Sequence, residues 1–139
     1  MILNIVYLII ATCLGLIVGW EREIRDKPAG LRTITFITLG AALSVIFTKE
    51  FIPIMTDKMN FDSIRLIAYY IVALGFVGGG ITAKISNRVH GITTASLLLP
   101  MAFVGLFCGL GKIRYAVIVT AIIFIVLKLK GATKRKRKK

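Results

Sequence analysis

Most of this sequence consists of five apolar segments, and their lengths constrain the fold more than any other feature does. The segments cover residues 2–20, 31–47, 64–83, 91–110 and 113–129. Each is long enough, or nearly so, to cross about 30 Å of hydrocarbon as a helix, which takes about 20 residues. A backbone in lipid must form its hydrogen bonds within its own segment, so helices are expected rather than strands. The sequence therefore predicts an all-α fold, a polytopic membrane protein with a bundle of about five transmembrane helices.

The composition excludes a soluble domain of useful size. Hydrophobic residues make up 57% of the chain and the mean hydropathy is +0.85, whereas soluble domains contain about 45–50% apolar residues. We expect residues 1–130 to form a transmembrane domain and residues 131–139 to form a polybasic cytoplasmic tail. The two cysteines, Cys13 and Cys108, each lie within an apolar segment, where small packed side chains are expected rather than a disulfide or a ligand pair.

The distribution of basic residues predicts an orientation in the membrane. Fourteen Lys and Arg residues fall in the first loop, the third loop and the tail, against five on the opposite side. Because cytoplasmic loops carry the excess of basic residues, the C-terminus is predicted to be cytoplasmic and the N-terminus outside. No basic residue precedes the first apolar segment, so this segment is predicted to be a retained helix rather than a cleaved signal peptide.

The tail contains an uninterrupted run of basic residues at positions 134–139. Such a run just inside a membrane is attracted to anionic lipid, by about 1 kcal/mol for each residue near the surface. No aromatic residues are interleaved with it and no folded nucleic-acid-binding module accompanies it. We therefore expect the bilayer and anionic lipid as partners of the tail, and no nucleic acid.

Seven charged residues lie in the stretch 19–32, between the first two apolar segments. Glu21 and Glu23 are two residues apart and diverge by about 200° on a helix, so they are not expected to hold one metal ion together. Each is a weak candidate for a cation ligand or a partner contact. The first helix is expected to extend into this stretch and to end before Pro28. Helical spacing predicts three ion pairs: Glu21 with Arg25, Glu23 with Lys27, and Arg22 with Asp26.

Glycines recur four residues apart in three of the segments. The pairs are Gly15 and Gly19, Gly75 and Gly79, and Gly105 and Gly109. Each pair leaves a groove in which another helix can lie close, either within the bundle or across a homodimer. Gly78, Gly79 and Gly80 are consecutive, and each costs a helix about 1 kcal/mol relative to alanine. The third helix is therefore expected to be tightly crossed, kinked or unwound there.

The longest loop is predicted at residues 48–63. It contains a proline and balanced charges, as expected of a surface connection. Asp62 and Ser63 are expected to cap the following helix. Arg65 lies one turn inside that helix, where its side chain can either extend to the interface or take part in a structural ion pair.

A short third loop, residues 84–90, leads into Gly91, Thr93 and Thr94. Threonine hydroxyls at the start of a membrane helix can bond to its own backbone or to a neighbouring helix. We expect both threonines to have one of these structural uses.

The sequence lacks the motifs of an enzyme. The run that ends at Gly111 and Lys112 has Leu106 where a phosphate-binding loop needs glycine and Ile113 where it needs Ser or Thr. The sequence has no nucleophile elbow, no paired histidines and no Cys-x-x-Cys motif. We therefore predict that the protein is not an enzyme and has no cofactor.

Six motifs occur in order along the chain: Gly-Trp-Glu-Arg-Glu at 19–23, Lys-Pro-Ala-Gly-Leu-Arg-Thr at 27–33, Leu-Gly-Ala-Ala-Leu at 39–43, Arg-Leu-Ile-Ala at 65–68, Gly-Phe-Val-Gly-Gly-Gly at 75–80 and Gly-Ile-Thr-Thr-Ala-Ser at 91–96. Together they resemble the MgtC/SapB family of bacterial inner-membrane proteins, over about residues 5–127. Two positions depart from the family pattern, with Ile34 in place of a histidine and Leu99 in place of a tryptophan.

The resemblance implies a multi-pass protein of the bacterial inner membrane that regulates other membrane proteins. It also implies a link to low-magnesium adaptation or virulence, and ATP synthase as a partner. Many members carry a soluble C-terminal domain, whereas here the basic tail follows the last apolar segment. A function that resides in that domain is therefore not expected of this sequence.

Three functions fit the sequence. The favoured one is a non-enzymatic regulator that docks a membrane-protein partner. A small cation (magnesium) transporter or channel component would place Glu21 or Glu23 at its inner mouth, although neither lies at the middle of a segment, where ionisable groups usually mark a pathway. A scaffold would use the glycine grooves to form an oligomer. The predicted functional polar cluster of the regulator consists of Glu21, Arg22, Glu23, Arg32, Thr33, Gly78, Gly79, Gly80, Gly91, Thr93 and Thr94.

Overall fold

The structure, a computed structural model, describes residues 2–55, 63–85 and 88–136. These residues form five helices and one short hairpin: α1 (Ile2–Ile24), α2 (Leu31–Met55), α3 (Ser63–Ile81), β1 (Ala83–Ile85), β2 (Arg88–His90), α4 (Ile92–Gly109) and α5 (Ile113–Lys136). Four helices, α1 to α4, contain stretches that are long and apolar enough to cross a membrane. The predicted all-α, multi-pass membrane fold is confirmed.

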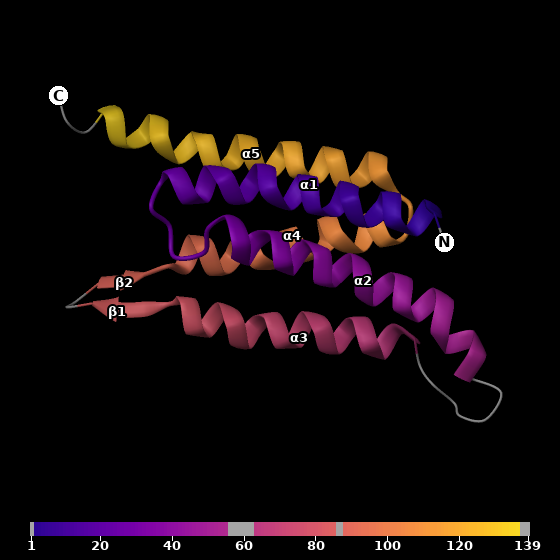
Figure 1. The fold of residues 1–139 in the computed structure, drawn as a ribbon. Helices are drawn as coiled ribbons and strands as arrows, with labels where there is room; N and C mark the ends of the chain where they lie inside the picture. The colour runs from indigo at the N-terminus through magenta and orange to yellow at the C-terminus, as the bar shows by residue number, and fades with distance from the viewer. Residues whose placement is uncertain (1, 56–62, 86–87, 137–139) are drawn as a thin grey trace.

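The helices lie side by side in one elongated bundle (Figure 1). Its central helix is α2, against which both α1 and α4 pack extensively. Helix α5 packs mainly against α4 and also runs along α1, and α3 packs beside α4. One end of the bundle holds the α1–α2 turn, the β1–β2 hairpin, the start of α4 and the last turns of α5. We call this end the motif end and the opposite end the far end. Loops distant in sequence thus meet at the motif end.

Close contact between backbones joins the three central helices. A Cβ atom added to Gly15 would lie 2.9 Å from the Cα atom of Thr35, and one added to Gly19 would lie 2.8 Å from the Cα atom of Leu31. On α4, a Cβ atom on Gly109 would lie 2.7 Å from the carbonyl oxygen of Ala42. Two of the three predicted glycine grooves are therefore confirmed, and both receive α2.

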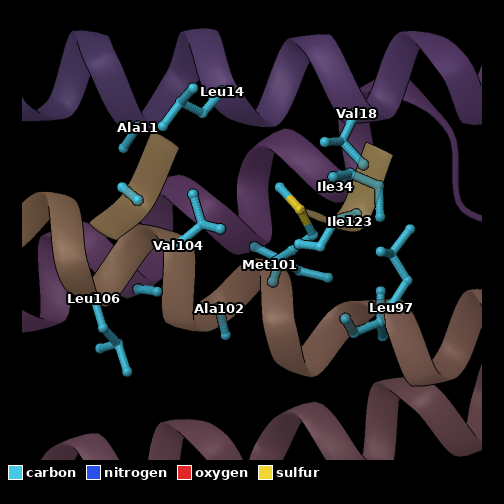
Figure 2. Close-up of a cluster of buried hydrophobic side chains, with 14 of the residues drawn as sticks. Ala11, Leu14, Val18, Ile34, Leu97, Met101, Ala102, Val104, Leu106 and Ile123 are labelled. Carbon is cyan, nitrogen blue, oxygen red and sulfur yellow. The ribbon is translucent and has the colours of Figure 1, made fainter. Parts of the chain in front are cut away.

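Apolar side chains fill the space around these contacts. Figure 2 shows Leu14 and Val18 of α1, Ile34 of α2, and Met101 and Val104 of α4 in one cluster, and all of them are buried. Many large apolar side chains on the outer faces are exposed instead, as expected where lipid tails replace water as the solvent. The packed core is therefore narrow and lies along α2.

The expectation of a tight crossing or break at the glycines of α3 is wrong. The helix continues through Ile81, and added Cβ atoms on Gly79 and Gly80 would find no atom within 4 Å. A Cβ atom on Gly78 would make an ordinary contact, 3.6 Å from Cβ of Ala95. The reason is that α3 lies at the edge of the bundle and has neighbours on one side only.

The loop predicted at residues 48–63 begins later than expected. Residues 48–55 continue α2, and the rings of Phe47 and Phe51 stack with centroids 5.2 Å apart, one turn from each other. The Nζ atom of Lys49 donates to the carbonyl oxygen of Gly109, 3.2 Å away, at the end of α4. The additional residues of α2 therefore contact the end of α4. The predicted cap at Asp62 lies outside the described residues.

The third loop and the last helix also differ in detail from the prediction. The third loop forms an antiparallel hairpin in which Ala83 pairs with His90 and Ile85 with Arg88. The last helix, α5, continues beyond the apolar segment to Lys136. Both differences lie at the motif end, where the chain leaves its apolar segments.

Candidate functional site

The α1–α2 turn forms the centre of the motif end. Helix α1 ends at Ile24, before Pro28 as predicted, and Asp26 adopts a positive φ of 49° that reverses the chain. The amide of Asp26 donates to the carbonyl oxygen of Glu23, at 3.0 Å, and the amide of Lys27 donates to that of Arg22, at 3.1 Å. These bonds satisfy two of the carbonyls that a helix leaves free at its C-terminus.

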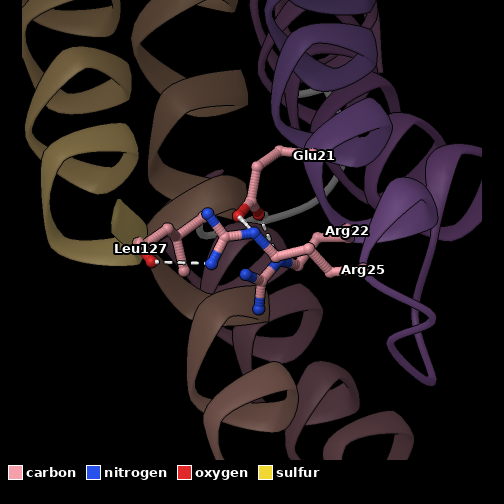
Figure 3. Close-up of polar contacts among 4 residues, drawn as sticks. All are labelled: Glu21, Arg22, Arg25 and Leu127. Atoms are coloured by element: carbon pink, nitrogen blue, oxygen red, sulfur yellow. Dashed lines mark hydrogen bonds and ion pairs between the residues drawn. The ribbon is translucent and has the colours of Figure 1, made fainter. Parts of the chain in front are cut away.

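Two charged residues of the turn are buried. Only 8% of Glu21 and 3% of Arg22 are exposed. The Nε atom of Arg22 donates to Oε2 of Glu21, 2.7 Å away, and the Nε atom of Arg25 lies 2.7 Å from Oε1 (Figure 3). The predicted pair between Glu21 and Arg25 is confirmed, and Arg22 joins it to form a cluster of one carboxylate and two guanidinium groups. We call these three residues the Arg–Glu cluster.

The Arg–Glu cluster also connects α1 to α5. The Nη1 atom of Arg25 donates to the carbonyl oxygen of Leu127 over a long 3.4 Å, and the Arg25 side chain is 37% exposed. Its contact with Oε1 of Glu21 lacks hydrogen-bond geometry, so within the described residues that buried oxygen accepts no hydrogen bond. Arg25 is therefore held more loosely than Arg22, whose side chain is 4% exposed.

The other two predicted ion pairs are wrong. Within the described chain, Arg22 pairs with Glu21 rather than with Asp26, and Glu23 does not pair with Lys27. Instead, Oε2 of Glu23 accepts a hydrogen bond from the amide of Leu31 at 2.9 Å. That amide is one of the free donors in the first turn of α2, so Glu23 caps the helix across the turn. The Glu23 carboxylate bonds to this amide rather than to Lys27, because an ion pair with an exposed lysine contributes little to stability.

Gly30 leaves the space in which the Glu23 side chain caps α2. A Cβ atom on Gly30 would lie 2.9 Å from Cδ of the Glu23 side chain and closer still to Oε2. Any side chain at Gly30 would therefore displace the carboxylate that caps α2. The motif thus combines a capping acid with the glycine that makes room for it.

Of the other predicted residues, Gly91 and Thr94 are the most tightly placed. Gly91 precedes α4 with a positive φ of 89°, and a Cβ atom there would collide with the carbonyl oxygen of Ile81. Thr94 is 2% exposed, in the first turn of α4. Both residues therefore fix the start of α4 against the end of α3.

The remaining predicted residues are spread over the surface. Arg32 and Thr93 are exposed at the motif end and Thr33 is partly exposed. Gly79 and Gly80 are exposed on α3, near the hairpin. Arg65 lies in the first turn of α3, at the far end, and so is remote from the cluster.

The cluster does not have the chemistry of a cation site. Glu21 is the one buried acid in the described chain, and two guanidinium groups leave the cluster with a formal charge of +1. The described residues contain no group of three His, Cys, Asp or Glu side chains suited to a metal ion. Glu21 and Glu23 are therefore engaged by protein groups rather than arranged as ligands.

Sequence reasoning missed Arg25 and Leu127 as members of the site. The four-residue spacing of Glu21 and Arg25 predicted their ion pair, but nothing in the spacing showed that α5 would close over it. The contact of Arg25 is with a backbone carbonyl, which has no side-chain signature. The packing of α5 against α4 and α1 brings Leu127 into reach.

A second feature of this half of the bundle is an apolar groove of about 400 Å³ between α3 and α4. Its lining includes Leu74, Gly75, Gly78, Gly79, Ala95 and Leu98. The glycines of α3 contribute to this space, because Cβ atoms added to Gly75 and Gly79 would find no atom within 4 Å.

Comparison with known proteins identifies relatives of this chain. The sequence model of the MgtC family matches residues 8–136. Protein MgtC of Brucella abortus (strain 2308) is 37% identical over 118 residues, which cover 84% of this chain and 46% of that protein. Protein MgtC of Salmonella typhimurium (strain LT2) is 35% identical over 119 residues, covering 86% and 48%. The chain thus spans about half the length of these relatives, and no solved structure matches it.

Proposed function

The chain belongs to the MgtC family, and we propose that it is a non-enzymatic regulator that docks a second membrane protein at its motif end. In this proposal the motif end faces the cytoplasm of a bacterium, across its inner membrane, as the excess of basic residues favours. The regulated partner links the protein to low-magnesium adaptation or virulence, and the family resemblance makes ATP synthase the first partner to test.

One observation carries this proposal: four of the six motifs, at 19–23, 27–33, 75–80 and 91–96, come from separate parts of the sequence and meet at one end of the bundle. Buried Glu21 and Arg22 pair with each other at the end of α1, Glu23 caps α2, and Arg32 is exposed on the first turn of α2. A rigid turn that presents an exposed arginine suits recognition, because arginine is enriched at the energetic centres of interfaces. The exposed charged residues of this stretch are Arg25, Lys27 and Arg32 against Glu23 and Asp26, and this small net positive charge favours an acidic partner surface.

The same geometry disfavours transport of cations. A pathway needs an ionisable group that can bind and release its ion, usually inside the membrane. Glu21 is instead flanked by two guanidinium groups, each with a nitrogen 2.7 Å from a carboxylate oxygen. Magnesium flux into liposomes that carry the purified protein, abolished by Glu21→Gln, would overturn the regulator proposal in favour of transport.

Co-purification of ATP synthase from native membranes tests the docking proposal. Arg32→Ala is the informative change, because Arg32 is exposed and its loss should leave the fold intact. We expect it to reduce the recovered ATP synthase about tenfold, as for an energetically central arginine. Arg114→Ala is the matched control, an exposed arginine at the far end.

Recovery that is the same for wild type, Arg32→Ala and Arg114→Ala would contradict docking through the motif end. Glu21 is unsuited to this test, because its removal changes the buried cluster as well as any contact.

A further inference from the structure

The Arg–Glu cluster carries more positive charge than its carboxylate balances. Glu21 supplies one negative charge to the guanidinium groups of Arg22 and Arg25. The C-terminus of α1 adds the equivalent of about half a negative charge, which still leaves an excess. The net positive charge of the cluster attracts an anion to its open side.

The open side of the cluster is Arg25. Arg22 is almost wholly buried, but 37% of the Arg25 side chain is exposed. Its described bonds are weak for an arginine: the 2.7 Å contact with Oε1 of Glu21 lacks hydrogen-bond geometry, and the carbonyl oxygen of Leu127 is 3.4 Å from Nη1. A guanidinium group binds best to paired oxygens in one plane. Phosphate oxygens would satisfy Arg25 better than these two acceptors do.

The height of Arg25 along the bundle places it where lipid phosphates lie. From Ile2 to Trp20, α1 spans about 27 Å at 1.5 Å per residue, close to the thickness of the hydrocarbon. Trp20 is 62% exposed, as is typical of a tryptophan at the membrane interface. The apolar part of α5 ends near Leu127, the residue that Arg25 reaches, and exposed Lys128 follows. Arg25 therefore lies just beyond the hydrocarbon.

We propose that Arg25, held against the junction of α1 and α5 by Glu21 and Leu127, binds a phosphate group, supplied by the headgroup of an anionic lipid. Glu21 and Arg22 are positioning residues. This site is distinct from the basic tail, because it depends on the geometry of one arginine rather than on the number of charges.

The test measures lipid binding to the full-length purified protein by native mass spectrometry. Phosphatidylglycerol and phosphatidylcholine are compared, since both carry a phosphate but only the first is anionic. We expect Arg25→Gln to weaken the binding of phosphatidylglycerol about tenfold, the effect of losing one charge-assisted contact. Lys27→Gln is the matched control, because it removes the same charge from an exposed residue two positions away. Arg25→Lys, which keeps the charge but loses the paired donors, should be intermediate.

Equal weakening by Arg25→Gln and Lys27→Gln would overturn the proposal, because general electrostatic attraction would then explain the binding. A second arm adds inorganic phosphate without lipid and measures the melting temperature. If inorganic phosphate raises the melting temperature only when Arg25 is present, while lipid binding is the same with and without Arg25, the proposal that the bound phosphate group belongs to a lipid is overturned. This proposal and the docking proposal fail separately, since one depends on Arg25 and the other on Arg32.

Discussion

The replacement Gly105→Ala tests the packing of α2 against α4. A Cβ atom at Gly105 would collide with the carbonyl oxygen of Thr38 and would lie 2.8 Å from Cβ of Ala41. Carbon atoms prefer separations of about 3.5–4.0 Å, so the contact with Ala41 alone requires the two helices to move apart by about 0.7 Å, and the collision with the Thr38 carbonyl requires more. Overpacking of this kind costs about 1–3 kcal/mol, and the better helix propensity of alanine returns at most about 1 kcal/mol. We expect a net loss of about 1–2 kcal/mol in the free energy of unfolding.

Gly79→Ala is the matched control, because it makes the same change in the glycine pair of α3. No atom lies within 4 Å of the added Cβ atom, so only helix propensity changes and stability should stay the same or rise by up to about 1 kcal/mol. Unfolding by SDS in mixed micelles, followed by far-ultraviolet circular dichroism, measures both variants. If Gly79→Ala destabilises the protein as much as Gly105→Ala does, then Gly79 must be in close contact with another group, and the explanation by open space around Gly79 is refuted. A second copy of the chain, packed against this groove in a homodimer, would be one such group.

Three further predictions use the same unfolding assay. Glu21→Ala should lower the free energy of unfolding by about 3–5 kcal/mol, because it leaves buried Arg22 without its counter-ion. Glu23→Ala should lower it by about 1 kcal/mol, since it removes only the cap on Leu31. Equal losses for the two variants would contradict this difference in burial. Tyr70→Phe removes the 2.6 Å hydrogen bond from the Tyr70 hydroxyl to the carbonyl oxygen of Ile37. It should lower the free energy of unfolding by about 0.6 kcal/mol, the average for a hydrogen bond between membrane helices. An unchanged unfolding midpoint would show that this bond does not stabilise the packing of α3 against α2. Gly91→Ala should lower the free energy of unfolding by at least about 1–2 kcal/mol, because an alanine there must adopt a φ of 89° beside the carbonyl oxygen of Ile81. An unchanged stability would contradict the close contact between the start of α4 and the end of α3.

The sequence was sufficient to predict the helices but not which glycine pairs would be buried. Helix existence follows from apolar length, because a lipid-exposed backbone has no other way to bond. The pairs in α1, α3 and α4 have the same spacing, yet only the pairs in α1 and α4 face α2. What distinguishes them is the position of each helix in the bundle, which depends on contacts between distant segments. Local spacing carries no information on those contacts.

The candidate site was predictable to the extent that its contacts are local. The pair of Glu21 and Arg25 follows from four-residue spacing on a helix, and the structure confirms it. The cap that Glu23 forms on Leu31 could not be predicted, because it requires the chain to reverse at Asp26 and to make room at Gly30. The burial of Arg22 depends on neighbouring helices in the same way. Turn geometry and helix packing therefore explain the parts of the site that sequence patterns missed.

The local origin of the Arg–Glu cluster bears on what it can do. Both partners of Glu21 come from its own chain segment, one residue and four residues later, so the ion pairs can form as soon as α1 and its final turn form. A carboxylate fixed so early and so locally is poorly suited to exchange its counter-ion during a transport cycle. Its contacts lie at the end of α1, and Arg25 extends them to the carbonyl oxygen of Leu127, so they join the end of α1 to α5. The Arg–Glu cluster therefore fits the recognition that we propose at the motif end better than it fits conduction through the bundle.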